Sequence, residues 1–141
     1  MEIVFVCTGN TCRSPLAESI AQSMTSAHTF TSRGIFATDG IPASRYTAQI
    51  IEEHHLSQAT KSAAFTKSDS EKDLILTMTA SHRDTIRSMY PASNVHTLVE
   101  YVQGTSRDIM DPYGGDYEIY LQTYHDLHKN ITKLLTKIEH Y

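Results

Sequence analysis

Four short apolar segments of the chain alternate with segments of helical pattern. Residues 2–6 and 73–78 are almost entirely apolar, which is typical of parallel strands covered on both faces. Residues 30–35 and 94–99 contain more polar and β-branched residues, so we expect them toward the edges of the sheet. The alternation predicts an α/β fold with one doubly wound sheet of four parallel strands, flanked by helices. Its ligand site should lie beyond the carboxyl ends of the strands.

Helical spacing of apolar residues appears at residues 44–54, 80–89 and 117–138. The last segment has the strongest pattern. Its tyrosines at positions 117, 120 and 124 continue into leucine and isoleucine at the same spacing, so we expect them to pack in the core rather than bind a ligand.

Length and composition limit the number of domains and the kinds of partner that we expect for this chain. A chain of 141 residues is long enough for one core, so we expect a single domain over residues 1–141. The net charge of −4 leaves no sequence-wide basic footprint for nucleic acid, and no apolar stretch approaches a membrane span. Without a leader pattern, the chain is expected to be cytoplasmic, with no nucleic-acid or membrane partner. The two cysteines, Cys7 and Cys12, are only five positions apart, so a disulfide between them would do little to stabilise a whole domain. This cysteine usage suggests a reducing compartment.

The most informative segment lies directly after the first apolar run. It reads Cys7, Thr8, Gly9, Asn10, Thr11, Cys12, Arg13 and Ser14. A helix should follow, with Ser14 as its N-cap, Pro15 in its first position and an end near Ala27. A strand, a glycine-containing loop and a helix in this order direct backbone N–H groups and the positive helix end at one point. Such a point suits phosphate, and the adjacent cysteine predicts a phosphatase with a cysteine nucleophile.

The residues of this loop suit that chemistry. Cysteine attacks as the thiolate, and the helix N-terminus, Arg13 and Ser14 would all stabilise negative charge on Cys7. The planar guanidinium of Arg13 would also bind two phosphoryl oxygens. Gly9 would permit a backbone conformation, or an approach to phosphate, that a side chain would obstruct. Asn10 tolerates positive φ, and we expect it to brace the loop by hydrogen bonds.

A second loop supplies the candidate acid. Asp111 precedes Pro112, which favours an extended backbone, and glycines follow Tyr113. We expect Asp111 to protonate the leaving group and then to activate water. The segment from about 102 to 115 could fold over the phosphate site as a lid, with Tyr113 either lining the cleft or anchoring the loop.

The segment from Val6 to Glu18, together with Asp111-Pro112-Tyr113, closely resembles the low-molecular-weight protein tyrosine phosphatases over essentially the whole chain. The resemblance implies a small sheet of four parallel strands. It also implies Cys7 as nucleophile, Arg13 as phosphate ligand, Ser14 as support for the thiolate and Asp111 as acid and then base. It assigns no metal or organic cofactor. Phosphate or substrate contacts are expected from Thr8, Gly9, Asn10, Thr11, Cys12, Ser14 and Tyr113.

Thr11 distinguishes branches of that family. Tyrosine-specific members usually carry isoleucine or leucine at this position, whereas the threonine resembles the bacterial protein arginine phosphatases. A hydroxyl lowers the cost of placing a charged guanidinium there. The expected function is therefore hydrolysis of phosphoarginine on phosphorylated proteins, with inorganic phosphate as product. The alternative is a tyrosine phosphatase that uses the same cysteine mechanism.

Three further residues near this loop have roles that the sequence suggests. Cys12 is either a small packing residue in the loop or the partner of an oxidised Cys7 in a reversible disulfide. Thr60 stands where some relatives carry a histidine that braces the loop, and Ser32 matches a position that holds the loop's shape.

Other classes of function fit less well. His125 and His128 share a helical face and His54 adjoins His55, but these histidines form no ligand constellation, so we expect no metal site. Arsenate reduction on the same scaffold commonly uses additional cysteines. A phosphate-binding module would not need both Arg13 and Asp111.

Overall fold

A computed structural model describes residues 1–139 and shows a four-stranded, fully parallel sheet flanked by helices. Its strands are β1 (Glu2–Cys7), β2 (Thr29–Gly34), β3 (Leu74–Thr77) and β4 (Val95–Thr97). Its helices are α1 (Arg13–Met24), α2 (Arg45–Glu53), α3 (Lys67–Ser70), α4 (Ala80–Met89), α5 (Leu98–Gln103) and α6 (Tyr117–Ile138). The strand order β2-β1-β3-β4 puts the two most apolar strands in the centre, so the predicted fold class and edge positions are confirmed.

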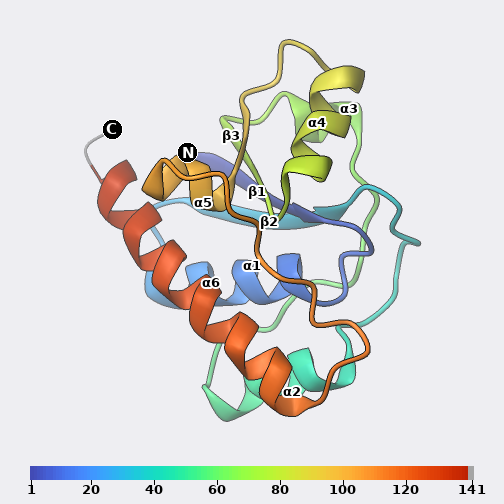
Figure 1. Ribbon diagram of the computed structural model, residues 1–141, viewed down its shortest axis with the longest axis vertical. Coiled ribbons are helices and arrows are strands. Elements are labelled where there is room, and N and C mark those ends of the chain that lie inside the picture. The colour runs from blue at the N-terminus through green and yellow to red at the C-terminus, as the bar shows by residue number, and fades with distance from the viewer. Residues whose placement is uncertain (140–141) are drawn as a thin grey trace.

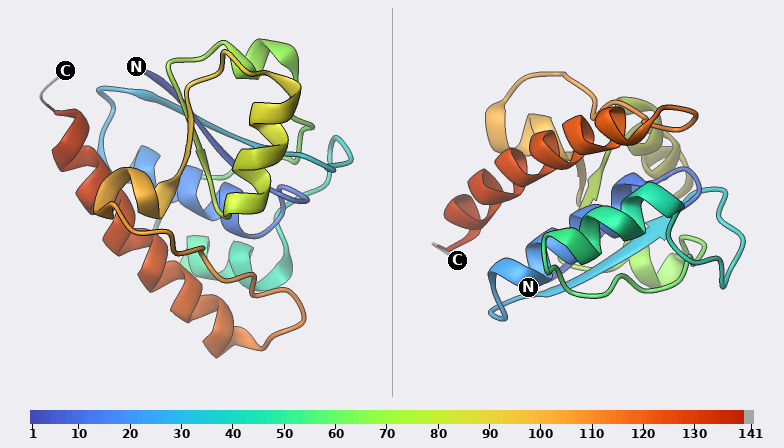
Figure 2. Two further views of the ribbon diagram at one scale, coloured as in Figure 1. Left: turned by 45° about the horizontal axis from the view of Figure 1, so that its top comes forward. Right: turned by 90° about the horizontal axis from the view of Figure 1, so that it is seen from below.

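Helices cover both faces of the sheet. Along β1, Ile3 and Phe5 enter a large core with α1 and α6, whereas Val4 and Val6 face a smaller cluster with Ile86 of α4. Figure 1 shows α1 and α6 on one side of the sheet and α4 on the other, and Figure 2 shows the same layers from two further directions. Because both faces are covered, β1 is buried along nearly its whole length, which accounts for its unbroken apolar sequence.

The long helix α6 contributes its tyrosines mainly to packing. Tyr120 and Tyr124 are buried in the large core, and Tyr117 packs against it. The structure therefore confirms the expectation drawn from their spacing. None of the helices described within residues 1–139 is both long and apolar enough to cross a membrane.

The fourth strand is shorter than predicted because a helix begins inside the expected range. Thr97 Oγ1 accepts the Glu100 backbone N–H at 3.0 Å, and the Glu100 carboxylate accepts the Thr97 N–H at 2.6 Å. This capping box starts α5 at Leu98, and a similar one at Thr66 starts the short helix α3. Both helices were missed by the search for apolar periodicity.

The start of α1 also differs from the prediction. Cys12 occupies the N-cap position, so Ser14 lies inside the helix and Pro15 is its third residue. Proline is tolerated there because first-turn N–H groups have no partner within the helix. At the other end, the extended backbone of Thr25 ends the helix at Met24 instead of near Ala27.

Gly34 ends β2 against the loop that follows β1. A Cβ atom on Gly34 would lie 2.6 Å from the Thr8 carbonyl oxygen and 2.9 Å from the Asn10 backbone nitrogen. These are backbone atoms of the loop and cannot rotate away. The absence of a side chain at Gly34 therefore allows β2 to support the loop at close range.

We predict that Gly34→Ala lowers the free energy of unfolding by about 2 kcal/mol, because the added methyl group overpacks this contact. Urea denaturation measures the change. Gly9→Ala is the matched control for stability, since a Cβ there would meet only Thr11 Oγ1, at 3.8 Å. If both variants were equally stable, the contact at Gly34 would not constrain the loop.

Candidate active site

A cleft of about 320 Å³ opens where β1 passes into α1. It is lined by Cys7, Thr8, Gly9, Thr11, Cys12, Arg13, Asp111 and Tyr113. Two segments that are remote in sequence thus meet at one cleft, and it contains eight of the ten site residues expected from the sequence. Asn10 and Ser14, the other two, lie behind the cleft wall and are almost fully buried.

The sulfur of Cys7 lies at the end of β1, next to a serine hydroxyl. Cys7 is 3% exposed, and its Sγ is 2.9 Å from Ser14 Oγ. Ser14 Oγ also lies 2.7 Å from Asn10 Oδ1, to which it can donate. The place of Ser14 in the first turn of α1, rather than at the N-cap, brings its hydroxyl to the sulfur.

Asn10 braces the loop as expected. Its φ of 55° lies in the left-handed region, which asparagine tolerates better than most residues. The side-chain amide donates to the Ser32 carbonyl at 3.3 Å, while its oxygen faces Ser14. Gly9 has no positive φ, so the first of the two reasons offered for a glycine there does not hold.

A buried carboxylate supports this brace from behind. Glu18 is fully buried and accepts hydrogen bonds from the hydroxyls of Ser32 and Thr60, as well as from the Thr60 backbone N–H. Thr60 thus contacts the same network that positions Ser32, whose carbonyl holds Asn10. Sequence analysis had singled out Ser32 and Thr60, but not the carboxylate between them.

Arg13 joins the loop to the segment that carries Asp111. Its side chain is 5% exposed, its Nη1 donates to the Ile109 carbonyl at 3.0 Å, and its Nη2 lies 3.7 Å from Asp111 Oδ2. The side chain of Asp111 is 54% exposed, so it can meet both solvent and a group bound in the cleft.

The segment before Asp111 is attached to the end of β3 and the start of α4. The Ile109 N–H donates to the Met78 carbonyl at 2.8 Å, and Asp108 Oδ1 accepts the Ala80 N–H at 2.9 Å. Ile109 is itself buried. In this conformation the segment is tied to the scaffold close to Asp111, so the predicted lid corresponds at most to the residues after Ile109.

Thr11, Tyr113 and Cys12 also line the cleft. Thr11 is half-buried, and Tyr113 is 84% exposed although it lines the cleft. Both cysteines are free. Cys12 Sγ donates to Ser44 Oγ at 3.4 Å and lies 3.7 Å from the Tyr120 hydroxyl. Burial, followed by the interaction with Cys12, raises the pKa of Tyr120 to about 12.

His82 is a residue of this region that sequence analysis missed. Its Nε2 lies 2.8 Å from Thr8 Oγ1 and its Nδ1 lies 3.0 Å from Thr79 Oγ1. Burial and then the positive charge of Arg13 lower its pKa to about 4, against the opposing effect of Asp108 and Asp111. His82 follows the N-cap Thr79 by three residues, and nothing in the sequence indicated its contact with Thr8.

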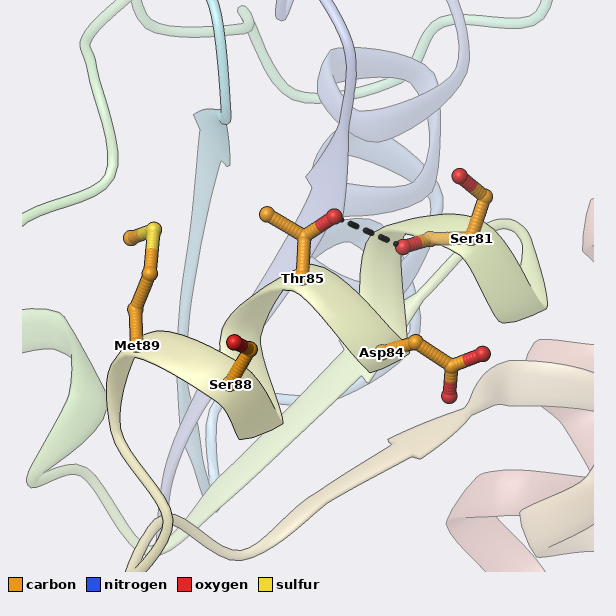
Figure 3. Close-up of a pocket in the computed structure, with 5 residues that line it drawn as sticks. All are labelled: Ser81, Asp84, Thr85, Ser88 and Met89. Carbon is orange, nitrogen blue, oxygen red and sulfur yellow. Dashed lines mark hydrogen bonds between the residues drawn. The ribbon is translucent and has the colours of Figure 1, made fainter.

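Two features outside this cleft are a hollow on α4 and the histidines of α6. A shallow hollow along the outer face of α4 is lined by Ser81, Asp84, Thr85, Ser88 and Met89, and the Thr85 hydroxyl there donates to the Ser81 carbonyl (Figure 3). His125 and His128 pack their rings against Tyr124. Within the described part of the chain, no group of three or more histidine, cysteine or acidic residues could hold a metal ion.

Comparison with known families agrees with this geometry. The sequence model of the family described as low molecular weight phosphotyrosine protein phosphatase matches residues 2–141. A match of this length, on a fold with a cysteine loop at a cleft, defines a cysteine-based protein phosphatase. The chain belongs to the low molecular weight protein tyrosine phosphatase family.

Individual relatives are named as phosphatases of two different substrates, tyrosine and arginine. The low molecular weight protein-tyrosine-phosphatase PtpB of Staphylococcus aureus is 50% identical over 135 residues, which cover 95% of this chain and 96% of that relative. The structure of YwlE arginine phosphatase from Geobacillus stearothermophilus is 34% identical with a TM-score of 0.94, covering 98% of this chain and 92% of that one. A C7S mutant of YwlE arginine phosphatase with a phosphorylated active-site serine, also 34% identical, has a TM-score of 0.95 and covers 99% and 96%.

We predict that protonation of His82 lowers the free energy of unfolding in mild acid. Because its pKa is lowered from 6.5 to about 4 on folding, the unfolded chain binds a proton between these values that the folded chain does not. The free energy of unfolding should therefore fall as pH falls through this range. His82→Gln should reduce that fall, measured by urea denaturation at pH 7 and pH 5. The exposed His125, as His125→Gln, is the control, and equal pH dependence in wild type and His82→Gln would contradict the prediction.

Proposed function

We propose that this protein is a protein arginine phosphatase that hydrolyses phosphoarginine on proteins through a cysteinyl-phosphate intermediate. The observation that carries the proposal is the position of Thr11, which lines the same cleft as Cys7, Arg13 and Asp111. Cys7, Thr11 and Arg13 come from one loop, and Asp111 reaches the cleft from a separate segment.

The character of Thr11 favours a charged leaving group. A guanidinium carries N–H groups that lose solvent when they enter a cleft, and a hydroxyl can compensate for part of that loss. An isoleucine would offer only apolar contact, which suits a phenyl ring. Among the eight residues that line the cleft, Tyr113 is the one aromatic residue, and most of its surface faces solvent.

Cys7 is the proposed nucleophile. Its sulfur attacks phosphorus in line, so that an S–P bond forms as the P–N bond breaks. Ser14 Oγ lies 2.9 Å from the sulfur, and its single hydrogen can turn from Asn10 Oδ1 to the thiolate and stabilise the negative charge there. Arg13 uses one Nη1 N–H for the Ile109 carbonyl, and its other N–H groups are available for equatorial phosphoryl oxygens, together with the backbone amides from Thr8 to Ser14.

Asp111 is the proposed proton donor and acceptor. The leaving guanidine has a conjugate-acid pKa above about 12, so expulsion without a proton would be very unfavourable. Asp111 gives its proton to the leaving nitrogen. As a carboxylate it then takes a proton from water, whose oxygen attacks phosphorus, breaks the S–P bond and releases inorganic phosphate. The exposure of Asp111 at the cleft mouth suits both tasks.

The relatives support both this proposal and its alternative. Two structural neighbours are named arginine phosphatases, which favours phosphoarginine. The relative with the higher identity, PtpB, is named a tyrosine phosphatase, which favours phosphotyrosine as the second candidate substrate. The same Cys7, Arg13 and Asp111 steps would serve either one.

We predict a higher kcat/KM for phosphoarginine than for phosphotyrosine in peptides of otherwise identical sequence. Both rates are obtained from released phosphate at one pH, with Cys7→Ser as the blank. Faster turnover of the phosphotyrosine peptide would overturn the arginine assignment and leave the phosphatase assignment in place.

We predict that Thr11→Ile lowers the ratio of kcat/KM for phosphoarginine to that for phosphotyrosine by about tenfold or more, because the cleft loses a polar group and gains apolar surface. Thr132→Ile makes the same chemical change at an exposed position on α6 and should leave the ratio unchanged. An unchanged ratio in Thr11→Ile would remove Thr11 from substrate selection.

A further inference from the structure

His82 connects the start of α4 to the loop after β1. It is the third residue of α4 and is 8% exposed, and its ring lies between two threonine hydroxyls. Its Nδ1 is 3.0 Å from Thr79 Oγ1, and its Nε2 is 2.8 Å from Thr8 Oγ1. Thr8 is exposed and lines the cleft beside Cys7.

The helix cap determines the direction of these hydrogen bonds. Thr79 Oγ1 already accepts the backbone N–H of His82 at 3.2 Å, as an N-cap hydroxyl does. Among the described residues, His82 Nδ1 is the acceptor within reach of the hydrogen that Thr79 carries. When Nδ1 accepts that hydrogen, a neutral imidazole bears its own hydrogen on Nε2. The Nε2–H group then donates to Thr8 Oγ1.

The surroundings of His82 agree with a neutral ring. Burial is the main cause that lowers its pKa to about 4, and the positive charge of Arg13 adds to this, while Asp108 and Asp111 oppose it. At neutral pH the ring therefore has one donor and one acceptor. A protonated ring would have two donors, and Thr79 could no longer donate to it.

We propose that Thr8 is a phosphate-binding side chain whose hydroxyl donates a hydrogen bond to a phosphoryl oxygen in the cleft, and that Thr79 and His82 are positioning residues that orient this hydroxyl. Since His82 Nε2–H donates to Thr8 Oγ1, the hydrogen of Thr8 is free to point into the cleft. Thr8 thereby adds a side-chain donor to the backbone amides of the loop. The proposal rests on phosphate binding by the Cys7 loop, which is part of the proposed function, but not on arginine selectivity.

Thr8→Val removes the hydroxyl at nearly constant shape. A hydrogen bond to a charged group corresponds to about a tenfold change in affinity, so we expect the inhibition constant for inorganic phosphate to rise about tenfold. The kcat/KM for p-nitrophenyl phosphate should fall by a similar factor. Thr8→Ser keeps the hydroxyl and should stay within about twofold of wild type on both measures.

Variants of His82 test whether it acts through Thr8. His82→Leu should raise the phosphate inhibition constant about as much as Thr8→Val. His82→Gln should restore most of the affinity, because its amide nitrogen can take the place of Nε2 as donor. In the Thr8→Val background, His82→Leu should have no further effect on phosphate inhibition. Ser88→Ala, on the outer face of α4 shown in Figure 3, is the control and should behave as wild type.

Three outcomes would overturn the proposal. They are a wild-type inhibition constant in Thr8→Val, a full further loss from His82→Leu in the Thr8→Val background, and equal losses in His82→Gln and His82→Leu. Melting curves accompany every variant, and if His82→Leu does not fold, the Thr8→Val, Thr8→Ser and His82→Gln set still decides. Failure of the proposed function is separate, since it would appear as turnover that persists in Cys7→Ser.

Discussion

The brace that holds the loop between β1 and α1 is the constraint on which the rest of the site depends. The chain must leave β1 at Cys7 and enter α1 at Arg13, and it turns in between through the left-handed backbone of Asn10. The Asn10 amide donates to the Ser32 carbonyl and its Oδ1 accepts from the Ser14 hydroxyl, and these bonds fix that turn to β2 and α1. Because Cys7, the proposed nucleophile, and Arg13 lie at opposite ends of this loop, its shape determines whether both can reach one phosphoryl group.

Arg13 extends the constraint to Asp111, the proposed acid. A buried guanidinium is costly unless its N–H groups find partners, and here the Ile109 carbonyl supplies one. The same bond fixes the segment just before Asp111, which the Ile109 N–H and the Asp108 carboxylate also attach to the end of β3 and the start of α4. The residue that would bind phosphate thus also helps to place the residue that would protonate the leaving group. A buried cation at the cleft also explains how a chain of net charge −4 can attract an anion locally.

In the proposed function, chemistry and selectivity would be carried by different side chains. The proposed covalent steps need a sulfur, a guanidinium and a carboxylic acid, and these would serve a phenolate or a guanidine leaving group alike. Selection between the two leaving groups would then depend on the side chains that line the cleft around them, which include Thr11 and Tyr113. This separation fits a family whose relatives of closely similar fold carry tyrosine and arginine phosphatase names.

The sequence by itself determined the four strands, the central place of the two apolar ones, and the order of strand, loop and helix around the segment from Cys7 to Arg13. Local periodicity and turn propensities decide such features, because they depend on neighbours along the chain. Only the tertiary structure decided that Arg13 meets Asp111 and that His82 contacts Thr8 from 74 residues away. Contacts of that kind arise when strands and helices pack, and the spacing of residues along the chain carries no record of them.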